Sequence, residues 1–420
     1  MMSRLSETYR INHYRQMLVV PNEYFNSDFQ VEIATTQEDL QSAYTLLHDS
    51  YVGIRIIDPQ PSGLRCNVFT FLPTTTVVVA KHNGRVIGTV SLIKDSNSGL
   101  PSDREFPEEN NALRRQGKSL VEISALAVAP EYRGKHTITF LLTAFLYTHC
   151  REYFACDYML AAVHPKTETF YKALMGFVKN GKPLDYSSLK GAAAIHVSMD
   201  LSEAHLEKLT NSFKSKDPAK NFGLLLQLSD KRFFHLTKKN DLQISPVITP
   251  NLLKFFCLQQ KEIWSRLSST EQQTLIQVYS TYFGMDSVKE FLQVNGEIAA
   301  TKQYRTPVHI NALITADEQS KYFGRILDLN SGGCFLICTG ELPKPGQKIK
   351  IAFRFANNEY RLQAQVVWQN QGQAIKHHPN GVGIQFDEKI EGLNQDLKEW
   401  IYNALQPENV PNHAELQTGS

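Results

Sequence analysis

The sequence has almost no excess of charge of either sign. Its 44 lysine and arginine residues stand against 42 aspartate and glutamate residues, which gives a formal net charge of +2. A chain so evenly balanced has no general attraction for a polyanion, so any anionic partner must be met by a local patch. This balance argues against a protein that coats nucleic acid, and we expect neither DNA nor RNA as a partner.

The sequence also lacks a long apolar run. Its most apolar helix-like stretch, "ITFLLTAFLYTHC", is shorter than the roughly 20 residues that span a bilayer. The first twenty residues mix charge with only a short apolar end and lack the apolar core of a secretory signal. We therefore expect a soluble, cytoplasmic protein with no transmembrane segment.

Cysteine is scarce and scattered. The closest of the six cysteines are Cys334 and Cys338, four residues apart in a strand-like apolar segment rather than at the spacing of a metal knuckle. This pattern favours reduced thiols buried in the core. We predict no metal site.

The chain is too long for one ordinary core and should divide into two or three domains. After an N-terminal segment (residues 1–30), strand-like and helix-like stretches alternate through residues 31–200, which is typical of an α/β domain with a mixed sheet. An Asn83-Gly84 pair between two strand-like runs predicts a tight hairpin there.

The remaining sequence predicts two further regions. Residues 201–300 have helical spacing, with Ser268 and Glu271 in capping-box register, and form a helical extension or a linker. Short strands separated by Gly, Asn and Pro turns, then a last helix, predict a small all-β barrel over residues 301–405. The polar residues 406–420 are expected to be a disordered tail.

Two motifs of the α/β region resemble the GNAT N-acyltransferase fold: "LAVAPEYRGK", followed by a helix, and "FYKALMGF" at a later helix-to-strand junction. The resemblance implies a strand that splays from its neighbour and offers the backbone of Leu126, Ala127 and Val128 to a pantetheine arm. It also implies a phosphate-binding turn that includes Arg133 and Gly134.

A longer series of segments is similar to the FeeM-type N-acyl amino acid synthases, which are related to the acyl-homoserine-lactone synthases. These segments, in order, are "SGLR", "GTVSLIKDSNSGLP", "LRRQGKSLVEISALAV" and "FYKALMGF". The similarity implies an enzyme that joins a fatty acyl chain, carried on the phosphopantetheine of acyl carrier protein, to the nitrogen of an amino acid. The later "VYSTYF" also resembles the end of that family, so the helices could extend the same domain.

The phosphate turn bears on the choice of acyl donor. His136 and Ile138 stand where glycines are expected, and their side chains should crowd the backbone approach that a pyrophosphate requires. A carrier protein presents a single phosphodiester, so we expect acyl carrier protein rather than coenzyme A. Basic residues that could meet an acidic carrier, or merely be solvated, are Arg133, Lys135 and His136 and, further along, Arg114, Arg115 and Lys118.

Two residues are candidates for the chemistry. An amide-forming reaction needs an acceptor for the amine proton and a donor for the leaving thiolate. Glu122 lies on the expected catalytic strand on the same face as Ser124, and it is either the base or amine-orienting group or an exposed strand glutamate. Tyr171 resembles the GNAT tyrosine that protonates the departing sulfur, and its alternative is a core or rim tyrosine.

An amino-acid substrate also carries a carboxylate, for which a bidentate arginine is the natural partner, and Arg65 is the candidate. Asp95 and Asp103 could hold the amine or cap turns, and the turn role is favoured. His164 ends a predicted strand near the expected site, where a structural histidine is the favoured interpretation.

The barrel region resembles a PilZ domain through "QYRTPVHINALI", "GRILDLNSGGCFL" and "GVGIQF". In that family an RxxxR segment and a (D/N)xSxxG turn bind cyclic di-GMP, which implies roles for Arg305, Asp328 and Gly333. Thr301 stands where the first arginine belongs and Asn330 where the serine belongs. Cyclic di-GMP is therefore a possible ligand, and a barrel kept for packing or protein contact is the alternative.

Taken together, the sequence predicts an N-acyltransferase with a GNAT-like fold, a helical extension and a PilZ-like barrel that could respond to cyclic di-GMP. The alternatives are a coenzyme A dependent GNAT acetyltransferase and a signalling effector that binds its ligands without turnover.

Overall fold

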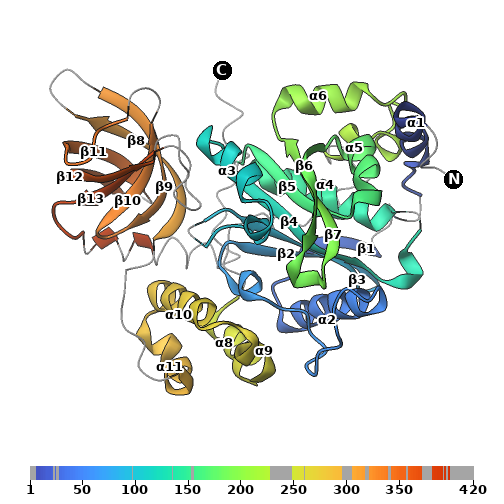
Figure 1. The fold of residues 1–420 in the computed structure, drawn as a ribbon, viewed down its shortest axis with the longest axis horizontal. Helices are drawn as coiled ribbons and strands as arrows, with labels where there is room; N and C mark the ends of the chain where they lie inside the picture. The colour runs from blue at the N-terminus through green and yellow to red at the C-terminus, as the bar shows by residue number, and fades with distance from the viewer. Residues whose placement is uncertain are drawn as a thin grey trace.

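The structure is a computed structural model, and Figure 1 shows its fold. The described residues are 6–21, 24, 28–96, 98–134, 136–152, 156–227, 248–259, 261–295, 305–316, 321–338, 342–355, 358–370, 381–390, 392–393 and 396–397.

The first region is built on a seven-stranded mixed sheet in the order β1-β2-β3-β4-β5-β7-β6. Its strands are β1 (Phe29–Ile33), β2 (Thr75–His82), β3 (Arg85–Lys94), β4 (Leu120–Val128), β5 (Tyr158–Val163), β6 (Val178–Tyr186) and β7 (Ala192–Asp200). All neighbours are antiparallel except β4 and β5. The predicted α/β domain with a mixed sheet is confirmed, and Asn83 and Gly84 form the predicted hairpin with positive φ angles of 50° and 76°.

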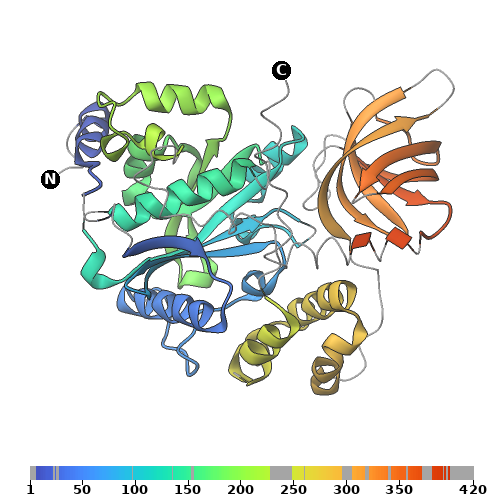
Figure 2. The same ribbon diagram turned by 180° about the vertical axis from the view of Figure 1, so that it is seen from behind.

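Helices cover both faces of this sheet. α2 (Gln37–Gly53) lies on one face, and α4 (Thr137–Glu152) and α5 (Glu168–Met175) lie on the other (Figures 1 and 2). The apolar residues of α4, which form the most apolar helix-like stretch of the sequence, are buried against the sheet, with Phe145 and Leu146 at most 1% exposed. At the N-terminal end, α1 (Glu7–Met17) packs on α5, where the Tyr14 ring meets Phe170 edge-on at 5.6 Å.

The helices that follow the sheet pack against the same core. They are α6 (Glu203–Asn211), α7 (Phe222–Leu225), α8 (Pro250–Lys254), α9 (Lys261–Arg266), α10 (Ser269–Phe283) and α11 (Lys289–Asn295). Phe256 contacts the Tyr44 ring of α2 at 5.2 Å, and the Tyr279 hydroxyl of α10 donates to Phe71 O. α10 starts at the predicted capping box of Ser268 and Glu271. The domain boundaries at residues 200 and 300 stay a prediction.

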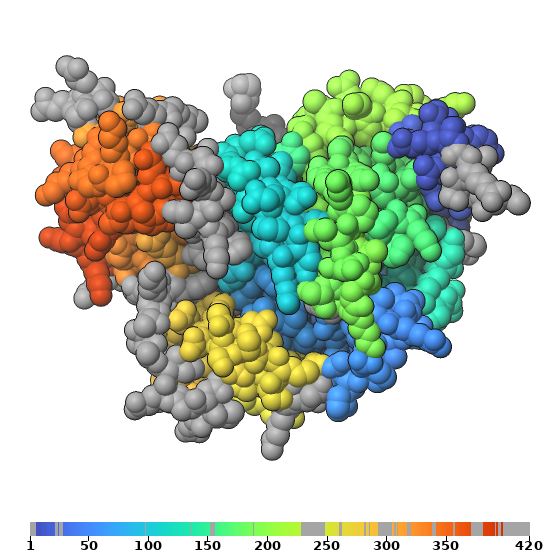
Figure 3. Space-filling view, in the orientation of Figure 1, coloured from blue at the N-terminus to red at the C-terminus, as the bar shows by residue number. Residues whose placement is uncertain are grey.

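The last region is a closed six-stranded barrel in the order β10-β13-β12-β11-β8-β9. Its strands are β8 (Thr306–Thr315), β9 (Lys321–Asn330), β10 (Gly333–Cys338), β11 (Lys348–Phe355), β12 (Asn358–Asn370) and β13 (Gly381–Phe386). It has its own apolar core, and it forms a separate lobe in the space-filling view (orange to red, Figure 3). The predicted all-β barrel is confirmed. Most of the predicted last helix and the whole tail of residues 406–420 lie outside the described residues.

The scarce cysteines behave as the sequence indicated. Cys66, Cys150, Cys156, Cys257 and Cys334 are buried and form no disulfide among the described residues. Within the part of the chain that the structure describes, no cluster of His, Cys, Asp and Glu could hold a metal ion. Over that same part, none of the helices combines the length and the apolar character needed to cross a bilayer.

Candidate functional site

The centre of the site is the place where β4 parts from β5. These parallel strands pair from Leu120 with Tyr158 to Ile123 with Ala161, and no pairing between them follows in the described residues. Ala125 then adopts a positive φ of 56°, and the register between β3 and β4 shifts at this point. Such a bulge bends a strand away from its neighbour, so the β5-facing edge of β4 is open from Ser124 onward. The predicted backbone donors Leu126, Ala127 and Val128 lie on this open stretch.

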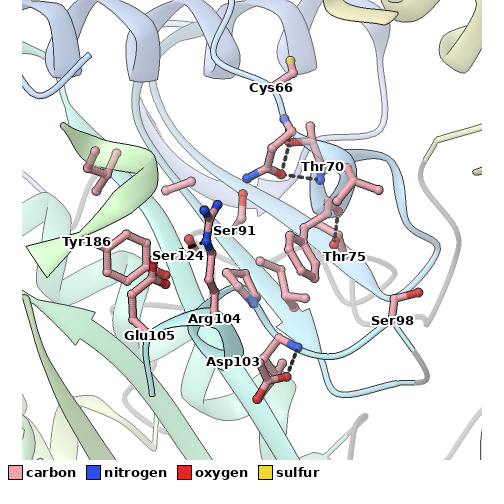
Figure 4. Close-up of a pocket in the computed structure, with 18 of the residues that line it drawn as sticks. Cys66, Thr70, Thr75, Ser91, Ser98, Asp103, Arg104, Glu105, Ser124 and Tyr186 are labelled. Atoms are coloured by element: carbon pink, nitrogen blue, oxygen red, sulfur yellow. Dashed lines mark hydrogen bonds and ion pairs between the residues drawn. The ribbon is translucent and has the colours of Figure 1, made fainter. Parts of the chain in front are cut away.

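Two cavities meet at the bulge. A 390 Å³ cavity extends into the gap between β4 and β5 and is lined mainly by apolar residues of β4, β5, β7 and α5. A 640 Å³ cavity lies on the other side and is more polar (Figure 4). The residues that line both are Tyr51, Ser124, Ala125, Tyr186 and Leu189. Two reactants, one in each cavity, would therefore meet at Ser124 and Ala125.

Glu122 lines the 390 Å³ cavity but is not the exposed strand glutamate of the alternative interpretation. It is 1% exposed, and its Oε2 accepts hydrogen bonds from Ser102 N at 3.0 Å and Ser102 Oγ at 2.7 Å. Burial raises the pKa of Glu122 to about 8, and the Ser102 hydrogen bonds oppose that rise. A carboxyl with such a pKa can release and accept a proton near neutral pH.

A buried polar network holds Glu122 in place. The Asn110 side-chain amide donates to Ser102 Oγ at 2.9 Å, and its oxygen lies 2.8 Å from His196 Nε2. Ser102, Asn110 and His196 are all fully buried. A buried polar group is costly when it is left without a hydrogen-bond partner. The series of hydrogen bonds from His196 through Asn110 therefore fixes Ser102, and Ser102 in turn fixes the Glu122 carboxylate.

The environment of Arg114 contradicts two predictions, that Arg114 meets a carrier protein and that Asp95 binds the substrate. Arg114 is 1% exposed, and its guanidinium pairs with Asp95 at 2.7 Å and Asp103 at 2.6 Å. Arg114 is therefore not available to a carrier protein, and that prediction is wrong. Asp95 is bound to Arg114, accepts Ser96 N and lies outside both cavity linings, so its placement as a substrate-binding residue is corrected in favour of the turn role. Asp103 lines the 640 Å³ cavity but is likewise bound to Arg114.

Tyr171 lies on α5 and lines the 390 Å³ cavity together with Glu122 and Ser124. Its ring meets Phe170 and Phe177 edge-on, at 5.5 Å and 6.0 Å. Burial, with a smaller effect of Tyr51, raises the pKa of Tyr171 to about 12, so it keeps its proton at neutral pH. His164 also lines this cavity, but its Nδ1 accepts Lys166 N at 3.1 Å, in agreement with a structural role.

Arg65 lines the 640 Å³ cavity, and no hydrogen bond or ion pair of its guanidinium is found among the described residues. Burial lowers its pKa below the usual value; Tyr51 opposes this and Arg266 adds to it. A partly buried guanidinium without a carboxylate is a ready site for an anionic group. Ser124, the other predicted substrate residue on this side, borders both cavities.

The expected crowding at the phosphate turn is wrong for Ile138. This side chain is 1% exposed and points into the core, where its Cγ2 would lie 2.5 Å from a Cβ added at Gly88 of β3. His136 does stand at a position that favours glycine, since its φ is +59°, and its ring lies 4.7 Å from the Phe170 ring. Gly134 has a φ of +100°, and Arg133 is tied back to Val128 O at 2.7 Å and Ser50 Oγ at 3.0 Å. Lys135 lies outside the described residues.

Three site residues were missed by the sequence interpretation: Ser102, Glu105 and Tyr186. Ser102 is the partner of Glu122, and Glu105 and Tyr186 lie together on one side of the 640 Å³ cavity (Figure 4). Ser102 and Glu105 belong to the segment "LPSDREFP", whose composition is typical of a polar turn. The sequence pattern of this segment does not indicate which of its side chains point inward. Tyr186 ends an edge strand with no motif around it.

In the barrel, Arg305 Nη1 lies 3.5 Å from Asp328 Oδ1, and the same oxygen accepts Phe335 N at 2.8 Å. Asn330 Oδ1 accepts Gly332 N at 3.0 Å and so forms the turn from β9 to β10. At Gly333 an added Cβ would lie 2.2 Å from Ile384 O, so only glycine fits there. Thr301 and its neighbour Lys302 lie outside the described residues.

Comparison with known proteins agrees with this architecture. Residues 42–200 match the family model described as N-acyl amino acid synthase FeeM, and residues 301–403 match the PilZ domain. No curated protein matches.

Similar solved structures include FeeM, an N-acyl amino acid synthase from uncultured soil microbes, at 24% identity over 43% of this chain and 93% of that chain, with a TM-score of 0.37. They also include the coenzyme A dependent acyl-homoserine lactone synthase BjaI with SAM and isopentyl-CoA, at 18% identity over 44% and 90% of the two chains (TM-score 0.35). A third is the acyl-homoserine lactone synthase LasI, at 11% identity over 45% and 97% (TM-score 0.35). On these two matches, residues 42–200 form an acyltransferase domain of the N-acyl amino acid synthase FeeM type, and residues 301–403 form a PilZ domain.

Proposed function

We propose that the protein transfers a fatty acyl chain from the phosphopantetheine thioester of acyl carrier protein to the amine of an amino acid. The observation that carries this proposal is Glu122, a buried carboxyl with a raised pKa that lines a cavity at the open edge of β4. A proton acceptor at this place is what an amine needs in order to attack a thioester.

The donor's pantetheine arm lies along the open edge of β4. Beyond Ile123 this edge has no partner strand in the described residues, so the backbone of Leu126 to Val128 can bind the amide groups of the arm as a neighbouring strand would. The thioester then lies near Ser124, beside the bulge. Arg133 and Gly134 belong to the turn that follows and shape the end of the site where the phosphate lies.

The acceptor enters from the 640 Å³ cavity, where the Arg65 guanidinium binds its carboxylate. Glu122 takes the proton from the attacking amine, the new C–N bond forms, and the C–S bond breaks. Tyr171 gives its proton to the departing sulfur, so that the thiol leaves neutral. The high pKa of Tyr171 supports this role because the hydroxyl stays protonated until the thiolate develops.

The choice of carrier protein over coenzyme A has two supports, the FeeM family match and the side chain of His136 at a position that favours glycine. Since Ile138 points into the core, it does not contribute to the choice.

The experiment that tests this function supplies the purified chain with dodecanoyl acyl carrier protein or dodecanoyl coenzyme A and each of the twenty common L-amino acids. Products are followed by mass spectrometry, and lipids of cells that express the chain are analysed in parallel. The expected result is an N-acyl amino acid formed faster from the carrier protein. Equal or faster use of coenzyme A would overturn the donor assignment, and no amide from either donor would favour an effector without turnover.

We also propose that the barrel binds cyclic di-GMP through Arg305 and the turn of Asp328 to Gly333. The support is the PilZ family match together with the position of the Arg305 guanidinium beside this turn. Binding at the barrel would then regulate the transferase.

For this site the expected result of Arg305→Ala is a Kd for cyclic di-GMP that is about 10- to 100-fold higher, because a hydrogen bond to a charged group is worth about 1.5–3 kcal/mol. Titration calorimetry measures it, with Arg361→Ala as the control, since Arg361 is exposed on β12 and pairs with Glu359. If the unchanged protein gives no binding heat, the barrel is not a cyclic di-GMP receptor.

A further inference from the structure

We propose that Glu105 binds the ammonium group of the amino-acid acceptor and so selects primary amines for the transferase. The inference rests on the proposed function and adds to it the group that holds the substrate's nitrogen. Glu105 follows the short helix η4 (Pro101–Arg104) and lines the 640 Å³ cavity (Figure 4).

Only one of the two oxygens of the Glu105 carboxylate has hydrogen-bond partners among the described residues. Its side chain is only 8% exposed. One oxygen, Oε1, accepts hydrogen bonds from Ser187 N at 3.2 Å and Ser187 Oγ at 2.5 Å. The other, Oε2, is buried and has no hydrogen-bond partner among the described residues. A buried carboxylate oxygen without a donor is costly, so this arrangement indicates a missing donor that arrives with a ligand.

The protein's own cations do not supply that donor in the described residues. Arg104 approaches Oε1 rather than Oε2, at 4.0 Å, and its side chain is 74% exposed. An ammonium group offers three N–H donors in a compact volume, which suits a single inward-facing oxygen. The ligand group that best fits Glu105 Oε2 is thus a primary amine in its charged form.

Other carboxylates on the cavity wall are already engaged. Asp103 binds Arg114 and accepts Leu100 N at 2.7 Å, and Glu271 accepts Ser268 N and Ser268 Oγ at the start of α10. Glu271 accepts both of these bonds through Oε2, as Glu105 accepts its own through Oε1. Among the described residues, Glu105 is nevertheless the lining carboxylate with a buried oxygen that has no hydrogen-bond donor.

Glu105 also lies on the route to the chemistry. Tyr186, beside it, borders both cavities, and burial first, then Glu122 and Glu105, raise the pKa of Tyr186. Tyr186 thus lines the cavity of Glu105 and the cavity of Glu122. An amine held at Glu105 is thus on the Tyr186 side of the cavity, next to the passage toward Glu122, and Arg65 remains for the carboxylate.

The test is Glu105→Gln, which keeps an oxygen for Ser187 but places an NH2 group where the ammonium would bind. With dodecanoyl acyl carrier protein and the best of the twenty L-amino acids, the expected result is a KM for the amino acid that is about 10- to 100-fold higher, with a smaller change in kcat. The inhibition constant of the 2-hydroxy acid with the same carbon skeleton, which has no ammonium group, should not change.

Two controls separate binding from structure. Ser187→Ala removes the hydroxyl that positions Glu105 but keeps the charge, and Glu108→Gln makes the same substitution at an exposed position of α3 (Pro107–Arg115). Both should keep a KM within a few-fold of the unchanged protein. An unchanged KM in Glu105→Gln, or equal weakening of the amino acid and the hydroxy acid, would overturn the inference and leave the proposed function standing. If the unchanged protein acylates no amino acid, the proposed function fails and the inference falls with it.

Discussion

Replacing Glu122 by glutamine is expected to lower kcat by about 10²- to 10⁴-fold, the usual contribution of a positioned general base. Glutamine has nearly the same shape and can still accept the Ser102 hydrogen bonds, so the fold and the cavity should persist. What is lost is the site that takes the proton from the attacking amine. Steady-state rates with dodecanoyl acyl carrier protein at saturating amino acid measure the effect.

The pH dependence makes this prediction specific. With a pKa of about 8, Glu122 is mostly protonated at pH 7, so kcat of the unchanged protein should rise through pH 8 and level off about one pH unit above it. Glu122→Gln should lose this rise. The matched control is Glu131→Gln, because Glu131 is exposed, pairs with Arg85 at 2.9 Å and lines neither cavity. A Glu122→Gln enzyme with more than a tenth of the normal kcat would show that another group takes the proton.

The same pKa shift predicts an effect on stability with a definite sign. The folded state raises the pKa of Glu122 from 4.5 to about 8, so folding favours the protonated form. Its contribution is fully present below pH 4.5 and decreases as pH rises to about 8, by up to about 1.4 kcal/mol for each pH unit. Relative to Glu122→Gln, the unchanged protein should therefore become less stable over this interval, and a pH series of urea unfolding tests it.

Much of the fold could be predicted because its signals are local. The Asn83-Gly84 hairpin, the capping box at Ser268 and the alternating strands of the barrel each depend on residues close together in the sequence. Residue periodicity and turn chemistry determine such elements, so the sequence alone indicates them.

The site was only partly predictable because its geometry depends on contacts between distant segments. Alternation placed Glu122 on β4, but its burial and its Ser102 partner depend on how the turn before α3 folds over the strand. The prediction for Ile138 was wrong because a sequence motif gives a residue's position but not the direction in which its side chain points. Gly88 of β3 has no side chain, which leaves room for Ile138 in the core. Arg114 looked like a surface base, yet two aspartates that lie 11 and 19 residues earlier bury it.

Substituting leucine for Arg114 is expected to lower the free energy of unfolding of the acyltransferase region by about 3–5 kcal/mol, because breaking a buried ion pair leaves its partners uncompensated. Here two carboxylates would be stranded: Asp95 and Asp103 are 14% and 7% exposed, and each binds the guanidinium through both of its oxygens. Since Asp103 adjoins Ser102, the loss should also loosen the support of Glu122.

Urea unfolding monitored through hydrogen exchange of the β4 amides measures this effect. The β4 amides report on the acyltransferase region and not on the barrel. Arg115→Leu is the matched control, because the neighbouring Arg115 is 31% exposed and lies 3.9 Å from an exposed Glu108, a contact worth about 0–1 kcal/mol. If Arg114→Leu is no less stable than this control, the network does not hold the turn. If instead stability falls and the additional substitutions Asp95→Asn and Asp103→Asn restore most of it, the cost lay in the stranded charges rather than in lost packing.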